Sequence, residues 1–267
     1  MAMESVYIEK HIVPNPELRI LPITEESWAL NMACHQEDPI YLEEYGYVEE
    51  EYLVSGLANV YAWEGTEGRP RIRTAGCPYC TRIIVRKPAD AKKFSGSVMV
   101  EMMHNGTEID NPCTGWATSF EHLLSSGDAY VGISVSGATF KALKTFDSER
   151  YAELSFKNPL PPELRRPPGN MALSPDQVNN VRGGAQPDDP DREKGLDFDM
   201  VSQVGSMIKR GLLGTPFEGY EAKRAYLVGV TFGEIPCYVS AILPYAMLEG
   251  DKPIYDGFII YMSGRAG

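Results

Sequence analysis

The sequence predicts an α/β fold, with a doubly wound, mostly parallel sheet that follows a group of N-terminal antiparallel strands. Apolar runs of strand length alternate with segments whose apolar residues recur every three or four positions, the spacings of buried strands and of helices. The chain has 267 residues, enough to bury one large core. We therefore expect residues 1–267 to form a single domain.

Residues 1–75 predict the antiparallel strands and hairpins. Within them, residues 45–56 and 58–63 mix aromatic and β-branched side chains with acidic ones, a composition typical of strands. Another strand-like run, residues 81–88, ends at a proline. The antiparallel strands therefore precede the expected parallel ones.

Residues 96–103 and 129–135 are short apolar runs, as in parallel strands that are covered on both faces. Between them, residues 116–124 predict a helix, and Gly127 follows it. A second helix is indicated by apolar spacing from Phe198 and is expected to end at Gly211. A strand before Gly229, a helix over residues 234–247 and a strand over residues 257–262 complete the expected order.

Residues 146–197 differ in composition from the rest of the chain. Prolines cluster at 159–162, 165–169 and 186–191. A long segment of this kind inside a compact domain is either a lid-like insertion or a linker. Both interpretations remain open from the sequence.

The composition indicates a class of partner. Asp and Glu total 37 against 25 Lys and Arg, a formal charge of -12 that repels nucleic acid and anionic membranes. Neither a membrane-spanning run nor a signal sequence is recognisable. We expect a soluble cytoplasmic protein that needs no cofactor and binds a small neutral or apolar substrate.

The five cysteines indicate free thiols rather than a disulfide framework, because their number is odd and their spacing is scattered. Cys77-Pro-Tyr-Cys80 has the spacing of a redox motif. A strand-like run follows it, however, so no helix dipole is expected to lower a thiol pKa. Redox chemistry is the weaker alternative. The cysteines are Cys34, Cys77, Cys80, Cys113 and Cys237.

The stretch from Gly229 to Gly233 follows the pattern G-x-S-x-G of a nucleophile elbow, with Thr231 in the serine position. The pattern predicts acyl-transfer chemistry. A β-branched residue is unfavourable at the positive φ of an elbow, although a threonine hydroxyl can attack when a base is near. Alternatively, Thr231 caps the following helix.

Segments spread over nearly the whole chain resemble the α/β-hydrolase superfamily, and within it the group of alpha/beta hydrolase domain proteins. The resemblance rests on the shared order of these segments. They are residues 46–61, 81–88, 143–151, 158–162, 199–205 and 253–257.

The resemblance implies a serine hydrolase whose elbow serine is followed by Gln and a small residue, whereas here Phe232 and Gly233 follow Thr231. Such proteins continue beyond the strand that matches residues 257–262, and their catalytic acid and histidine lie in that continuation. Neither can be assigned to a residue of this sequence. The sheet is therefore expected to be incomplete at its C-terminal edge.

The resemblance also implies an oxyanion hole made by backbone N–H groups of Phe232 and of the loop containing Asn105 and Gly106. A plain turn is the alternative for that loop. In the hydrolase strand order the third and fifth strands are neighbours, which places His104 near Thr231. We expect His104 to act as a substitute base or to shape the oxyanion pocket, or else to be an ordinary loop histidine.

Other candidate residues are weaker. Ser134 and Ser136 end a predicted strand, but no helix is expected behind them, so packing or hydrogen bonding near the cleft is favoured. His11, His35 and His122 lie in the N-terminal segment or on a helix. No metal site is expected, because the only close group has no recognised ligand spacing. That group is His104, Glu108, Asp110 and Cys113.

Two functions follow from these features. The first is an esterase- or lactonase-like hydrolase whose catalytic partners come from a second polypeptide or a homo-oligomer that covers the apolar sheet edge. The second is a non-catalytic member of the fold that keeps the cleft for binding.

Overall fold

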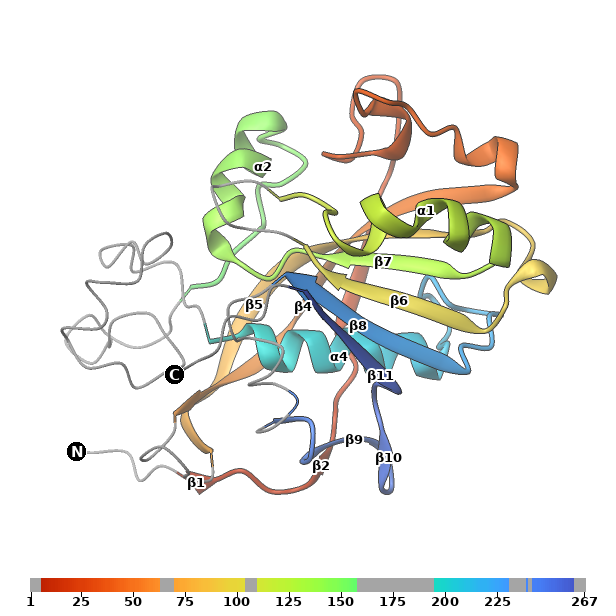
Figure 1. Ribbon diagram of the computed structural model, residues 1–267. Coiled ribbons are helices and arrows are strands. Elements are labelled where there is room, and N and C mark those ends of the chain that lie inside the picture. Colours follow the sequence, from red (N-terminus) through yellow and green to blue (C-terminus); the bar gives the residue numbers. More distant parts are fainter. Residues whose placement is uncertain are drawn as a thin grey trace.

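The computed structural model describes residues 6–62, 70–103, 110–157, 195–230, 239 and 242–261 (Figure 1). The helices are α1 (Gly115–Ser126), α2 (Phe140–Phe146) and α4 (Asp197–Arg210), with short 3-10 turns η1 (Ala33–His35), η2 (Leu42–Tyr45), η3 (Ala91–Lys93) and η4 (Gly137–Thr139). The strands are β1 (Val6–Tyr7), β2 (His11–Ile12), β3 (Glu17–Leu21), β4 (Tyr47–Ala62), β5 (Arg71–Pro88), β6 (Ser97–Met102), β7 (Ala129–Ile133), β8 (Arg224–Val230), β9 (Ala246–Glu249), β10 (Lys252–Pro253) and β11 (Gly257–Tyr261).

The main sheet has the order β11-β8-β6-β7-β5-β4-β3, and β1 pairs with β5 at one end. A separate small sheet has the order β10-β9-β2. The strands β7, β6, β8 and β11 are parallel neighbours. The strands β3, β4, β5 and β7 pair antiparallel.

The sheet is therefore mixed, and the expectation that it is mostly parallel was wrong. The reason is the hairpin of β4 and β5, whose 16 and 18 residues pair antiparallel from Tyr47 opposite Pro88 to Ala62 opposite Arg71. Since β5 also runs antiparallel to β7, the strands from β3 to β7 pair antiparallel, whereas those from β7 to β11 pair in parallel.

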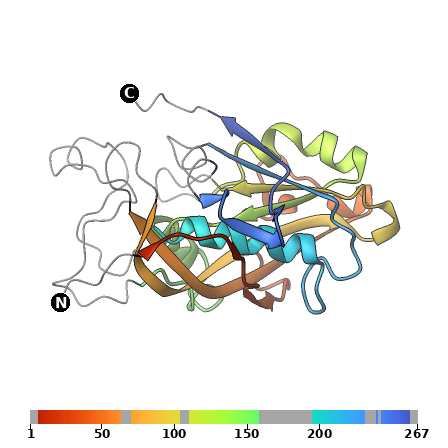
Figure 2. The same cartoon turned by 90° about the horizontal axis from the view of Figure 1, so that it is seen from below.

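Helices lie on both faces of the parallel half. Tyr130 of β7 packs with Trp116 and Leu123 of α1 in one apolar cluster. Its neighbour Val131 belongs to the larger cluster that contains Val204 of α4. Because successive strand residues point to opposite faces, α1 and α4 cover opposite faces, as Figures 1 and 2 show. That the rest of the fold is doubly wound stays a prediction.

Helix α4 forms where the apolar spacing predicted a helix. Its apolar residues from Phe198 to Ile208 are buried, and Asp199 and Lys209 place charges of the favourable sign in the first and last turns. Gly211 ends the helix in the left-handed conformation at φ 53°, and its N–H donates to the carbonyl of Met207. The prediction from local sequence is confirmed.

Two expected features near the sheet were wrong. The helix expected over residues 234–247 does not reach its C-terminal bound, because residues 246–249 form β9 and pair in parallel with β2. A helix does open behind Ser136, since η4 and α2 follow directly. The strand at residues 246–249 forms because it pairs with a segment far away in the sequence. The helix after Ser136 was not recognised because a 3-10 turn precedes it.

Most of the expected insertion over residues 146–197 lies outside the described residues, namely positions 158–194. At its start, Ser155 forms a bridge with Cys80 of β5. The lid-like role and the single-domain boundaries stay predictions. Within the part of the chain that the structure describes, no helix has the length and apolarity needed to cross a membrane.

Candidate functional site

The carboxyl ends of β6 and β8 lie side by side near the β11 end of the sheet. The two strands are parallel, and Met102, the last residue of β6, is paired with Gly229 of β8. The segments that follow these strands therefore leave the same edge of the sheet. Ligand sites of open α/β sheets form outside such carboxyl ends.

Most residues of the predicted site lie outside the described residues. Gly229 is the exception, and it lies in β8 between Met102 and Ile260 of the neighbouring strands. The contacts among the other predicted residues, and the conformation of the elbow, stay predictions. The residues outside the description are Thr231, Phe232, Gly233, His104, Asn105 and Gly106.

The described residues on either side of positions 104–109 are firmly held. The Met103 N–H donates to the carbonyl of Ile133 at 3.0 Å. Asp110 is fully buried. Its carboxylate accepts hydrogen bonds from the Ser134 hydroxyl and, at 2.9 Å, from Nε of Arg82. The stretch that carries the predicted oxyanion residues thus begins and ends at fixed points.

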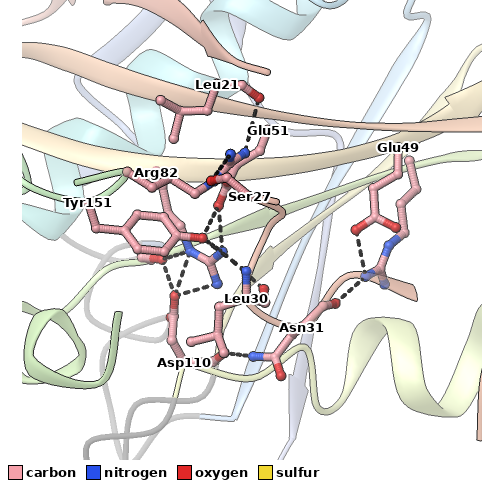
Figure 3. Close-up of polar contacts among 12 residues, drawn as sticks. Leu21, Ser27, Leu30, Asn31, Glu49, Glu51, Arg82, Asp110 and Tyr151 are labelled. Atoms are coloured by element: carbon pink, nitrogen blue, oxygen red, sulfur yellow. Dashed lines mark hydrogen bonds and ion pairs between the residues drawn. The ribbon is translucent and has the colours of Figure 1, made fainter. Parts of the chain in front are cut away.

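Arg82 is the centre of a buried polar cluster (Figure 3). Its guanidinium is fully buried and pairs with Asp110 on one side and with Glu51 on the other, where Nη1 lies 2.6 Å from Oε1. Nε also donates to the Ser134 hydroxyl at 3.2 Å. Burial acts to lower the pKa of Arg82, but Asp110 and Glu51 outweigh it and raise that pKa. The arginine is therefore permanently charged.

Glu51 joins a second arginine and a tyrosine to the cluster. Nε of Arg150 lies 2.6 Å from its Oε2, and the Tyr151 hydroxyl donates to Oε1 at 2.8 Å. Burial is the main cause that raises the pKa of Tyr151 to about 12. Tyr151 therefore stays neutral and acts as a hydrogen-bond donor at physiological pH.

The cluster also holds the loop that contains Leu30 and Asn31. Nη1 of Arg82 donates to the carbonyl of Leu30 at 3.1 Å, and the Leu30 N–H donates to the Tyr151 hydroxyl at 2.9 Å. The Asn31 side chain donates to the backbone carbonyl of Asp110, and Arg86 donates to the carbonyl of Asn31 at 2.8 Å. Both strand arginines therefore position this loop.

Glu101 provides a second buried anion, beside the start of α1. Its side chain points from β6 to the first turn of the helix, where its two oxygens accept four backbone N–H groups, those of residues 113–116, at 2.7–3.0 Å. The Tyr130 hydroxyl donates to it at 2.8 Å. The carboxylate thus satisfies the donors that a helix leaves free at its N-terminus. This arrangement occupies Glu101 structurally.

Ser134 and Ser136 have hydrogen-bonding roles, as expected. Ser134 is fully buried and donates to Asp110. Ser136 accepts the N–H of Ala138 at the start of η4. Neither arrangement places a histidine next to the serine among the described contacts, so the rival serine motif gains no support.

The described histidines lie apart from the buried cluster. His35 stacks on Trp28 with ring centroids 4.7 Å apart. His122 is largely exposed on α1 and lies 4.0 Å from Asp128. His11 is in β2, where its Nδ1 lies 3.0 Å from the carbonyl of Glu9.

Cys77 and Cys80 both lie within β5, so the expected strand context of this motif is confirmed. Cys77 is buried, and burial raises the pKa of the Cys80 thiol. Both effects oppose thiolate chemistry. Among the described cysteines, Cys34, Cys80 and Cys113 form no disulfide.

No group of His, Cys, Asp and Glu able to hold a metal occurs among the described residues. Two members of the group considered from the sequence, His104 and Glu108, are outside them. Asp110 is engaged by Arg82 and Ser134. The absence of a metal stays a prediction.

The motifs of the sequence do not predict the buried roles of Arg82, Glu51 and Glu101. Charged residues inside otherwise apolar strands were the feature of the sequence that could have indicated these buried ion pairs. Glu49 and Glu51 are two apart in β4, and Arg82 and Arg86 are four apart in β5, spacings that put each pair on one face. Opposite charges on one face of adjacent strands indicate cross-strand ion pairs.

A family model described as "Alpha/beta hydrolase domain" matches residues 16–267 of the chain. No curated protein matches the chain significantly.

Proposed function

Because the chain belongs to the alpha/beta hydrolase domain family, we propose that it hydrolyses an ester or a lactone with Thr231 as the nucleophile. The Thr231 hydroxyl attacks the carbonyl carbon and passes its proton to a base, for which His104 is the candidate. The alcohol then leaves, and water releases the acyl group from the threonine. Backbone N–H groups of Phe232, Asn105 and Gly106 stabilise the oxyanion.

The observation that carries this proposal is the pairing of Met102 with Gly229 in parallel strands. It supports placing the two segments with the candidate residues next to each other. The fixed positions of Met103 and Asp110 support a preorganised loop, which an oxyanion hole requires. The formal charge of -12 favours a small neutral or apolar substrate.

The experiment is turnover of p-nitrophenyl acetate together with labelling by a fluorophosphonate probe. Thr231→Ala is expected to abolish both, and Thr231→Ser is expected to retain or raise them because serine tolerates an elbow better. The control is Thr145→Ala, which removes an exposed hydroxyl near the end of α2. Activity unchanged in Thr231→Ala contradicts the assignment.

We also propose that a second polypeptide, or a further copy of this chain, pairs with β11 and covers this edge of the sheet. β11 is the last strand of the sheet order. Ile259 and Tyr261 are 48% and 55% exposed, and natural proteins rarely leave an apolar edge strand open. We also propose a cytoplasmic location, which the odd number and scattered spacing of the five cysteines support.

A second candidate function is a non-catalytic binding protein with this fold. Threonine at the elbow position favours it, because a β-branched residue is strained at positive φ. In that case neither Thr231→Ser nor Thr231→Ala changes a background rate. The same set of variants therefore separates the two functions.

A further inference from the structure

A cavity of about 240 Å³ is lined, among the described residues, by part of the segment 28–37 and by Phe146. Three aromatic side chains form its walls, Trp28, His35 and Phe146. The rings of Trp28 and Phe146 meet edge to face, with centroids 6.1 Å apart, while His35 stacks on Trp28. The cavity is smaller than the range of about 300–1,000 Å³ typical of pockets for drug-sized ligands, so it suits a small ligand or a single group.

Hydrogen bonds hold the two walls of the cavity in place. The Ser27 hydroxyl donates to Asp147 at 2.7 Å, which joins the residues next to Trp28 and Phe146. The floor includes Leu30 and Asn31, whose backbone is bound by the buried arginines described above. A site that is already rigid loses less entropy when a ligand binds.

The segment that forms most of the cavity lining is acidic. Residues 22–46, which form most of its lining, contain six carboxylates and no Lys or Arg. One of the carboxylates, Glu37, lines the cavity itself, is exposed, and forms no ion pair with any residue that the structure describes. This surface repels anions and attracts cations.

Aromatic walls beside an unpaired carboxylate suit an organic cation. The faces of aromatic rings carry negative potential, and quaternary ammonium groups bind in cages of such rings. We propose that this cavity is a binding site for a small alkylammonium cation, with Trp28 and Phe146 contacting the methyl groups and Glu37 supplying the opposite charge. The proposed ligand is not the ester that the proposed hydrolysis consumes.

The test is isothermal titration calorimetry of the full chain with choline. Its comparison is the uncharged isostere in which carbon replaces the quaternary nitrogen. Choline is expected to bind roughly tenfold more tightly than the isostere, because only the cation gains a cation–π contact, and to bind more weakly as salt increases. Equal binding of both compounds, or no binding of choline at millimolar concentration, overturns the proposal.

Variants place the binding in the cavity. Trp28→Ala is expected to weaken choline binding by roughly tenfold, and Glu37→Gln by severalfold, whereas Trp28→Phe keeps an aromatic face and most of the affinity. Tyr45→Ala is the matched control, since Tyr45 is 53% exposed in the same acidic segment but does not line the cavity. Wild-type affinity in a folded Trp28→Ala protein places the binding elsewhere. The measurement involves no turnover, so it is independent of the role of Thr231.

Discussion

Arg82 neutralises two carboxylates inside the protein, and its removal leaves both buried without that charge. Arg82→Met is expected to lower the free energy of unfolding by about 3–5 kcal/mol, the usual cost of breaking a buried pair from one side. Urea denaturation measures the change. The control is Arg19→Met, which breaks the exposed pair with Glu153 and is expected to change little. A loss for Arg82→Met as small as the control's contradicts the structural role.

Asp199 makes stability depend on pH. Burial is the main cause that raises its pKa above the ordinary 3.8, although hydrogen bonds from Tyr61 and Asn59 act in the opposite direction. The folded state therefore binds the proton more tightly than the unfolded state. The stabilising contribution of Asp199 is complete below pH 3.8 and is lost as pH rises from there through the higher folded pKa.

Asp199→Asn should remove this dependence, since an amide does not titrate in the range and still accepts a hydrogen bond. We expect a flatter curve of unfolding free energy against pH above 3.8 in the variant. Urea denaturation at a series of pH values measures it, with Asp251→Asn as the control at an exposed pair with Lys10. Parallel curves for wild type and Asp199→Asn are the contrary result.

At the scale of elements, α1 depends on an anion that is not part of the helix. Glu101 of β6 accepts the first N–H groups of α1, a role that a capping side chain within the helix usually fills. Thr114, at the N-cap position, makes no side-chain capping bond. The position of α1 on the sheet is therefore set by β6.

Glu101→Gln is expected to destabilise the protein by about 1–3 kcal/mol, because the amide NH₂ group faces N–H donors and leaves some of them buried without acceptors. The control is Glu121→Gln, on the exposed side of the same helix. Thermal or urea unfolding compares them. Equal stability of the two variants shows that the helix start does not need the negative charge.

The elements that were predicted correctly are those set by local sequence. Helix α4 was recognised from apolar residues at helical spacing and from Gly211, both of which are local properties. β9 was mistaken for the end of a helix, because its strand character arises from pairing with β2 near the other end of the chain. An apolar segment of a few residues forms either element, and its partner decides which.

At the scale of the whole molecule, the apolar edge at β11 is the feature that points to a partner. Ile259→Lys is expected to prevent pairing there, since a lysine on an edge strand opposes strand addition. In gel filtration the wild type is expected to elute above the 29.6 kDa of one chain and the variant to elute as a monomer. Leu213→Lys, at an 87% exposed position in a turn, is the control. A monomeric wild type free of any co-purifying chain contradicts the partner proposal.

The amino-acid sequence was enough to predict the family, the alternation of strands and helices, and the strand that leads to the proposed elbow. Repeated apolar spacing and glycine positions encode these features locally. Three further features became visible only in the folded chain: the mixed sheet, the pairing of Met102 with Gly229, and the contacts that join Arg82, Asp110 and Ser134. These depend on which strands become neighbours and in which register, and on the need of a buried charge for a partner. The sequence shows each charge, but only folding brings its partner to it.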